Sequence, residues 1–362
     1  MEQKKIRFNS PVNQEFIIEL RQKVAAYFEE RQLSKYGNGK LIPKALFMFA
    51  LYLLPYFLMI SGIISSFGGV LLCWILIGAG KAGVGMAVMH DANHSSFSAN
   101  QQINHWLGKS MYLLGGFPAN WRYQHNTMHH GFTNIEGYDE DIDPGPYLRI
   151  SPHKPRLGIH RFQHLYAWFL YSLMTLSWVI SKDLAQLNRY HRQGISLSSK
   201  LSYRQLVLSL IMAKAIYFTV FLVLPVLILP FAWYWCLFFF LMMHFTSGFI
   251  LTTIFQTAHV MISSDYPLPD ENGMMENNWA IHQLKTTSDF APGNRLLSWF
   301  IGGLNYQIEH HLFPNISHVH YPAIAPIVRE TASRYGLPYY VQPGFFSALK
   351  AHAAMLRKLG RE

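Results

Sequence analysis

The residues of this sequence most suited to chemistry are histidines, which gather in three short clusters. They read HDANH at 90–94, HNTMHH at 125–130 and QIEHH at 307–311. Residues four apart share one face of a helix, so His90 converges with His94, and His125 with His129. The adjacent His130 points about 100° away, which lets one helix serve two metals or two sides of one site. Neutral imidazole binds iron, copper, zinc or nickel, so the spacing predicts a metal site.

The number of histidines indicates more than one metal ion. A fourth segment contributes His259, which follows the last long apolar run. The predicted metal ligands are His90, His94, His125, His129, His130, His259, His310 and His311. Eight imidazoles exceed what a single zinc ion needs, so we expect a dinuclear site. Breaking an unactivated C–H bond requires a metal that activates oxygen, which favours two iron ions with O2 as co-substrate.

Acidic residues lie beside the histidine clusters. Asp91 and Glu309 adjoin predicted ligands and either orient the imidazoles through hydrogen bonds or are ordinary surface charge. The segment GYDEDIDPGPY resembles a calcium-binding loop in its spacing of aspartates. Pro144 stands where such a loop requires glycine, so we expect no calcium there.

The composition indicates that lipid surrounds the elements that hold these residues. Of the 362 residues, 51% are hydrophobic and only 14% are charged, whereas soluble domains carry about 25% charged residues. The formal net charge of +10 suits a surface that faces anionic headgroups. Lysines and arginines are scattered without a nucleic-acid motif, which argues against nucleic acid as a partner. Cys73 and Cys236 lie in apolar runs and are expected to be buried thiols.

Four apolar runs are long enough to cross a bilayer. They cover about 45–65, 68–89, 206–229 and 231–256 and form two helical hairpins. The predicted fold is an all-α integral membrane protein, with four transmembrane helices and a cytosolic helical cap that holds a di-metal site. The apolar stretch 162–180 is interrupted by polar residues and is predicted to lie in the membrane interface. A fifth span there would place the histidine clusters on opposite faces of the membrane.

The chain divides into three predicted parts. Residues 1–42 form a cytosolic N-terminal arm, with an amphipathic helix around Phe16–Phe28 that we expect to rest in the membrane interface. Residues 43–330 form the principal domain, with hairpins at about 45–89 and 206–256 and a cytosolic cap made of 90–205 and 257–330. Residues 331–362 form a cytosolic C-terminal tail.

Basic residues predict the orientation in the membrane. Four of them precede the first span, Arg31, Lys35, Lys40 and Lys44, and neither hairpin tip carries one. By the positive-inside rule, the termini and the histidine clusters face the cytoplasm. Lys81 and Lys214 lie inside apolar runs, and we expect their amines to extend to the headgroups. His244 lies deep in the last run, where a hydrogen bond between helices is favoured over contact with substrate.

The three histidine clusters together resemble the three histidine boxes of the membrane fatty-acid desaturase family. The likeness extends over about residues 45–330. It implies four spans, a cytosolic di-iron site and metal binding by the eight histidines named above. Gln307, where many members have histidine, resembles the front-end subgroup, which desaturates between an existing double bond and the carboxyl end. Gln307 would line the site.

The resemblance also shows where this chain departs from its relatives. Some relatives hold a metal through water with an asparagine four residues before the equivalent of His259, and Phe255 stands there in this chain. His282 is a candidate to fill that gap. The fused cytochrome b5 domain of many front-end enzymes, with its HPGG motif, is missing. This implies an external electron donor, either ferredoxin or free cytochrome b5, and resembles bacterial members, so a bacterial inner membrane is favoured over the endoplasmic reticulum.

The predicted function is oxygen-dependent desaturation of a fatty-acyl chain carried by coenzyme A, a lipid or acyl-carrier protein. A hydroxylase or ketolase on the same scaffold is the alternative, and the front-end-like third box favours desaturation. A metal transporter is a weaker alternative because it would need polar residues at mid-bilayer along its spans.

Overall fold

The computed structural model describes residues 6–8 and 13–362. It is about 67% helical with almost no strand, which confirms the all-α prediction. Two compact units share the chain between them. The first unit, called here the histidine unit, contains residues up to 37, 124–167 and 254–362, and the second, the span unit, contains 38–123 and 168–253. Each unit therefore draws on segments far apart in the sequence.

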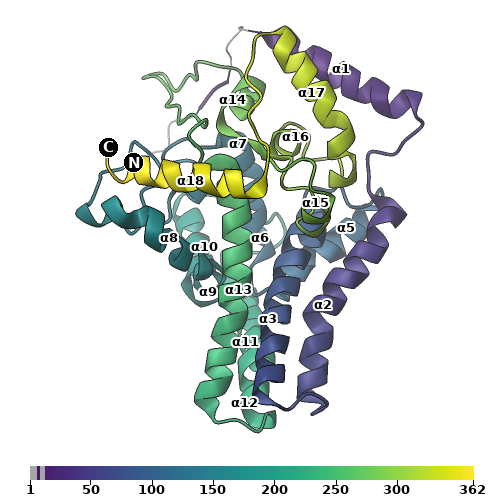
Figure 1. The fold of residues 1–362 in the computed structure, drawn as a ribbon, viewed down its shortest axis with the longest axis vertical. Coiled ribbons are helices and arrows are strands. Elements are labelled where there is room, and N and C mark those ends of the chain that lie inside the picture. Colours follow the sequence, from purple (N-terminus) through teal and green to yellow (C-terminus); the bar gives the residue numbers. More distant parts are fainter. Residues whose placement is uncertain (1–5, 9–12) are drawn as a thin grey trace. The chain divides into compact units, whose positions relative to one another are not determined.

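Within residues 6–8 and 13–362, four helical runs are long and apolar enough to cross a membrane, as predicted. They are Asn38–Ile60, Phe67–Asn93, Tyr203–Ile228 and Trp233–His259. The first is η1 (Asn38–Leu41) and α2 (Ile42–Ile60), and the second is α3 (Phe67–Val84), η2 (Gly85–Met89) and α4 (His90–Asn93). The third is α11 (Tyr203–Phe218), η8 (Thr219–Val223) and α12 (Leu224–Ile228), and the fourth is α13 (Trp233–His259). Figure 1 shows α2 lying alongside α3.

Small residues bring the spans of the span unit into close contact. A Cβ at Gly80 of α3 would lie 2.4 Å from the backbone nitrogen of Tyr52 in α2. A Cβ at Gly78 would lie 2.6 Å from the carbonyl oxygen of Met243 in α13. Glycine at these two positions lets backbones approach, which is how helices in a membrane gain packing contacts.

The intramembrane lysines do not extend to the headgroups, and that prediction was wrong. The Lys81 amine is buried and lies 3.0 Å from the Tyr217 hydroxyl and 3.3 Å from Nδ1 of His244. The Lys214 amine donates to the backbone carbonyls of Gly115 and Trp178 and pairs with Asp183. Partners supplied by neighbouring helices therefore satisfy both amines inside the protein.

The stretch 162–180 is a broken helix and not a fifth span. It comprises α8 (Gln163–Ser172), α9 (Met174–Ser177) and part of η7 (Trp178–Lys182). The remaining elements of the span unit are α5 (Gln101–Gly108), η3 (Lys109–Tyr112), α6 (Pro118–Arg122) and α10 (Asp183–Arg192). The placement of the stretch 162–180 in the membrane interface stays a prediction.

The histidine unit is built from short helices. The first are η4 (Tyr123–His129), which is π-helical, α7 (His130–Phe132), η5 (Glu140–Ile142) and η6 (Gly158–Phe162). The others are α14 (Trp279–Thr286), α15 (Arg295–Phe300), α16 (Gln307–Leu312), η9 (His318–His320), α17 (Tyr321–Arg334) and α18 (Phe345–Leu359). Strands β1 (Asp289–Phe290) and β2 (Val341–Gln342) pair in parallel, with Asp289 opposite Val341.

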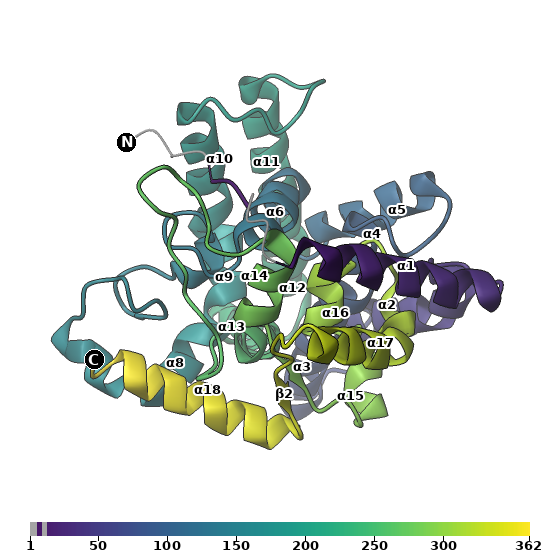
Figure 2. The same cartoon turned by 90° about the horizontal axis from the view of Figure 1, so that it is seen from above.

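The helix expected near the N-terminus is present as α1 (Gln14–Glu30). Its apolar residues Phe16, Leu20 and Val24 are buried in one cluster with Ile308 and Leu312 of α16. Figure 2 shows α1 lying next to α17. We expected the apolar face of α1 to rest in the membrane interface. That was wrong, because other parts of the protein cover this face. The predicted part boundaries at residues 42 and 330 stay predictions.

Candidate metal centre

Three of the predicted ligands lie on the π-helical turn η4 and the start of α7. The rings of His125 and His129 stack with centroids 5.4 Å apart, as expected for residues four apart. His130 turns its ring across His125, with the two Nε2 atoms 3.3 Å apart. π-Helical turns are rare and occur often at functional sites. This one places three buried imidazoles within a single turn.

His129, His259 and His311 form a compact group within the histidine unit. One ligand nitrogen from each lies within 4.8 Å of those of the other two. All three side chains are at most 1% exposed, and they come from η4, the end of α13 and α16. Nε2 of His129 and Nε2 of His311 are buried without a hydrogen-bond partner in the part of the chain that the structure describes. Buried polar atoms are rarely left unbonded, so this geometry is suited to a metal ion.

The opposite ring nitrogens of two of these histidines are held by side chains. Nδ1 of His129 lies 3.1 Å from Oδ2 of Asp139. Nδ1 of His311 lies 2.7 Å from Oε1 of Gln283. Burial alone would lower the pKa of His129, but the Asp139 carboxylate outweighs burial and raises it. Burial lowers the pKa of His311 well below its usual value, so this ring is neutral and able to bind metal.

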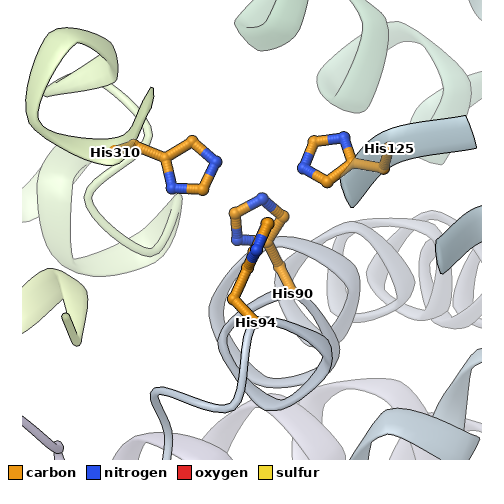
Figure 3. Close-up of side chains that lie close together, drawn as sticks. All are labelled: His90, His94, His125 and His310. Carbon is orange, nitrogen blue, oxygen red and sulfur yellow. The ribbon is translucent and has the colours of Figure 1, made fainter. Parts of the chain in front are cut away.

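His310 lies beside the same group but faces another direction. Its ring stacks on that of His125 with centroids 6.0 Å apart, and Figure 3 shows both rings. Nδ1 of His310 lies 3.1 Å from the Tyr321 hydroxyl. The ring of His130 lies 4.6 Å from that of His310 and 4.3 Å from that of His311. The second and third histidine clusters are therefore brought together, as predicted from the sequence.

The first histidine cluster lies in the span unit, at the end of the second span. His90 begins α4 directly after the π-helical turn η2. The rings of His90 and His94 lie 4.7 Å apart and project from one side of their helix, as Figure 3 shows. Trp121 packs against both rings at 5.8 and 6.2 Å. The convergence predicted for residues four apart is confirmed for this pair.

The sequence matches one protein family over most of its length. A sequence model described as "Fatty acid desaturase" matches residues 65–343. The chain belongs to the fatty acid desaturase family.

Curated relatives of this desaturase extend over nearly the whole chain. An sn-1 linoleoyl-lipid 6-desaturase of Synechocystis is 35% identical over 353 residues, 94% of this chain and 94% of the relative. The enzyme of the same name from Arthrospira platensis is 33% identical, covering 98% and 95%. An acyl-lipid (8-3)-desaturase of Physcomitrium patens is 34% identical over 96% of this chain and 72% of its own length. The chain is therefore an oxidoreductase of the membrane, a desaturase that acts on a fatty-acyl or lipid substrate.

Gln307 occupies the first turn of α16 in this desaturase. It is four residues before His311, so the two side chains share a helix face. Its side chain is 1% exposed, and Oε1 has no hydrogen-bond partner among the described residues. An unbonded oxygen beside the histidines is what a residue lining a metal site would present.

The desaturase has phenylalanine where some relatives have an asparagine ligand. The Phe255 ring packs 4.9 Å from the His129 ring and 5.0 Å from the His259 ring. This apolar ring excludes water from one side of the group. His282 does not join the histidine group, because its Nε2 lies 2.8 Å from the Thr133 carbonyl oxygen. Burial lowers the pKa of His282 to about 4, so it is a neutral ring that supports the segment following His130.

The two acidic neighbours of the histidine clusters are both buried. The Tyr339 hydroxyl lies within hydrogen-bond distance of both carboxyls, 2.9 Å from Glu309 and 2.7 Å from Asp289. Burial raises the pKa of both carboxyls, that of Asp289 to about 6. Asp91 is 2% exposed and interacts electrostatically with Lys44. Neither acid is surface charge, which was one of the two interpretations of the sequence.

Sequence reasoning missed two residues that contact the histidine rings directly. Asp139 belongs to the acidic segment that was considered only for calcium, and its position ten residues after His129 was the available signal. Gln283 lies next to His282 in α14 and carries no signal in a single sequence. Such contacts follow from folding and not from local spacing.

Proposed function

We propose that this protein is an oxygen-dependent desaturase of fatty-acyl chains, with a centre of two iron ions held by its eight clustered histidines. The observation that carries the proposal is the group of His129, His259 and His311, whose buried ring nitrogens lie close together and include atoms with no hydrogen-bond partner among the described residues. Membership in the desaturase family supports the same conclusion independently.

The eight ligands divide into two sets in this proposal. One iron is held by His129, His259 and His311. The resemblance to the family assigns four further ligands to the centre, His90, His94, His125 and His310. His130, whose ring contacts those of both His310 and His311, completes the ligands. Neutral imidazoles suit iron as ligands. Eight ligands shared by two iron ions leave coordination positions open for oxygen.

Iron with O2 would supply the oxidant that removes one hydrogen from each of two neighbouring methylenes. The balance requires two electrons and two protons besides the two hydrogens of the chain, so that one O2 becomes two waters. The protein holds the ligands and excludes water, and Phe255 and Trp121 are the apolar rings that pack against the histidines. The two electrons come from a separate carrier, ferredoxin or free cytochrome b5.

The substrate proposed here is an acyl chain on a membrane lipid. The relatives from Synechocystis and Arthrospira are named as acting on a linoleoyl lipid, and the moss relative as an acyl-lipid enzyme. The glutamine at position 307 supports a front-end reaction, on the carboxyl side of an existing double bond. We place the histidine centre on the cytoplasmic face of a bacterial inner membrane, from the basic residues that precede the first span.

The proposal is tested by expression in a bacterial host that lacks polyunsaturated lipids, supplied with linoleate. Gas chromatography with mass spectrometry of the lipid chains should show a new double bond on the carboxyl side of the existing one. Separation of lipid classes before analysis identifies the acyl carrier. Co-expression of a ferredoxin or of a cytochrome b5 identifies the electron donor.

Two controls give this experiment its meaning. His129→Ala should give no product, whereas His105→Ala, which changes an exposed histidine, should give the parent yield. Hydroxylated chains without new double bonds would replace the proposal with a hydroxylase. Purified protein that binds no iron would overturn it.

A further inference from the structure

Asp139 is buried and is surrounded by hydrogen-bond donors. Its Oδ2 accepts from the backbone nitrogen of Asn134 at 2.9 Å, and its Oδ1 accepts from the backbone nitrogen of Asp141 at 3.0 Å. Nδ1 of His129 lies 3.1 Å from Oδ2 and 3.3 Å from Oδ1. The side chain is 2% exposed. Both backbone groups are donors, so this position requires two acceptor oxygens, which a carboxylate provides.

These contacts fix the proton on the His129 ring. Both oxygens of Asp139 already accept backbone hydrogen bonds, so the contact with His129 is one in which Nδ1 carries the proton and donates it. In the neutral ring, which is the form that binds a metal, Nε2 then keeps its lone pair. That atom is buried and has no hydrogen-bond partner among the described residues, and its ring faces His259 and His311. The lone pair is therefore directed into the group where a metal ion is expected.

Gln283 determines which ring nitrogen of His311 carries the proton, through a neutral amide. Its Nε2 donates to the His130 carbonyl oxygen at 3.2 Å, which fixes the orientation of the amide. The reverse orientation would set the amide oxygen against that carbonyl. Oε1 therefore faces Nδ1 of His311 at 2.7 Å, so Nδ1 carries the proton and Nε2 keeps its lone pair.

We propose that Asp139 and Gln283 are positioning residues that set His129 and His311 as Nε2 ligands of one metal ion. The inference rests on the proposed function, because it presumes that the histidine group binds metal. It adds a difference between the two ligands. The Asp139 carboxylate makes the His129 imidazole a stronger electron donor to the metal. The neutral amide of Gln283 mainly fixes the direction of the His311 ring.

The test measures metal binding by the purified full-length protein in detergent, stripped of metal with a chelator. Cobalt(II) is the probe, because its visible absorption reports ligand type and geometry. Asp139→Asn should weaken cobalt binding about 10- to 100-fold and change the absorption spectrum. An asparagine places its NH2 group against one of the two backbone donors, so the ring loses its fixed orientation.

Asp143→Asn is the matched control for this variant. It removes the same charge from the same acidic segment, but its side chain is 61% exposed and pairs with Lys154. Cobalt affinity and spectrum should equal those of the parent. Equal affinities and spectra in Asp139→Asn and Asp143→Asn would overturn the inference. A parent protein that binds no cobalt or iron would instead overturn the proposed function.

Gln283 provides a second test that does not depend on Asp139. Gln283→Leu removes the acceptor for His311 and should weaken cobalt binding about 10-fold or more. Gln283→Glu keeps an acceptor for Nδ1 but sets its second oxygen against the His130 carbonyl oxygen, so its cobalt affinity should lie between those of the leucine variant and the parent. A glutamate variant as weak as the leucine variant would contradict the role of Gln283.

Thermal unfolding separates positioning from folding. A purely structural defect would lower the unfolding temperature of the metal-free protein. A positioning defect would instead reduce the rise in unfolding temperature that cobalt binding causes. If Asp139→Asn does not fold, the pair of Gln283 variants decides the inference.

Discussion

Two buried clusters of this protein contain histidine, and they differ in whether their polar atoms have partners. In the span unit, Nδ1 of His244 lies 3.0 Å from the Thr175 hydroxyl and Nε2 lies 3.2 Å from the Tyr217 hydroxyl. Both ring nitrogens therefore have protein partners. In the histidine unit, His129 and His311 are bonded only through Nδ1, and each Nε2 lacks a hydrogen-bond partner within the described residues.

This difference separates a structural network from a binding site. Leaving a buried polar group unbonded costs roughly 1–3 kcal/mol, so several such atoms that converge on one point favour a ligand there. The His244 cluster, with Lys81 and Tyr217, links α3, α11 and α13 through bonds it already has. We infer that the His244 cluster holds the spans together, whereas the geometry of His129, His259 and His311 is suited to a metal ion.

The largest effect should follow removal of an imidazole from the metal group. His129→Ala or His311→Ala should lower desaturase activity by more than about a thousandfold, because metal ligands act as a unit. Bound iron should fall as well, measured by metal analysis of the purified protein. His105→Ala serves as the control. Retention of activity and iron in either variant would contradict the assignment of this cluster as the metal-binding one.

A buried histidine with a protein partner should affect stability and not metal. Nδ1 of His352 donates to the Val260 carbonyl oxygen at 2.8 Å, and burial lowers its pKa to about 4. The folded state thus prefers the neutral ring. Stability is complete above about pH 6.5 and is lost as the pH falls toward about 4, by about 3 kcal/mol.

His352→Gln should make this acid loss shallower, as measured by the unfolding temperature of metal-free protein between pH 7 and pH 4. His105→Gln, which changes an exposed side chain, should leave the profile unchanged. A parallel profile for the parent and His352→Gln would show that His352 does not set this dependence.

Gln307 should give an intermediate effect on activity. Its unbonded Oε1 resembles the unbonded histidine nitrogens more than the satisfied His244 ring. Gln307→Ala should reduce activity about 10- to 100-fold, the usual range for residues that support a metal site. Metal-free stability should stay the same or increase, because a buried unbonded oxygen is removed. Parental activity in this variant would exclude Gln307 from the site.

The smallest effect should come from the network of the span unit. Tyr217→Phe removes the hydroxyl that lies near both Lys81 and His244. Hydrogen bonds between membrane helices contribute about 0.6 kcal/mol on average, so the unfolding temperature should fall slightly. Iron content and activity per iron should not change. A loss of iron in this variant would mean that the two clusters are coupled.

Some features of this protein follow from local sequence alone. Four apolar runs of sufficient length predict four spans, because an uncovered backbone in lipid must be helical. The four-residue spacing in HDANH and HNTMHH predicts convergent imidazoles, because helix geometry fixes which residues share a face. Both predictions hold, since neither depends on contacts with distant segments.

Other features were decided only by tertiary structure. Lys81 has the same sequence context whether its amine reaches water or bonds to Tyr217, and α11 supplies that hydroxyl from 136 residues away. The proton on His311 is set by Gln283, and that on His129 by Asp139, through contacts that spacing does not specify. The apolar face of α1 has the pattern of an interfacial helix, yet it packs against α17. The sequence determines that a buried polar side chain requires a hydrogen-bond partner, and the tertiary structure determines which atom is that partner.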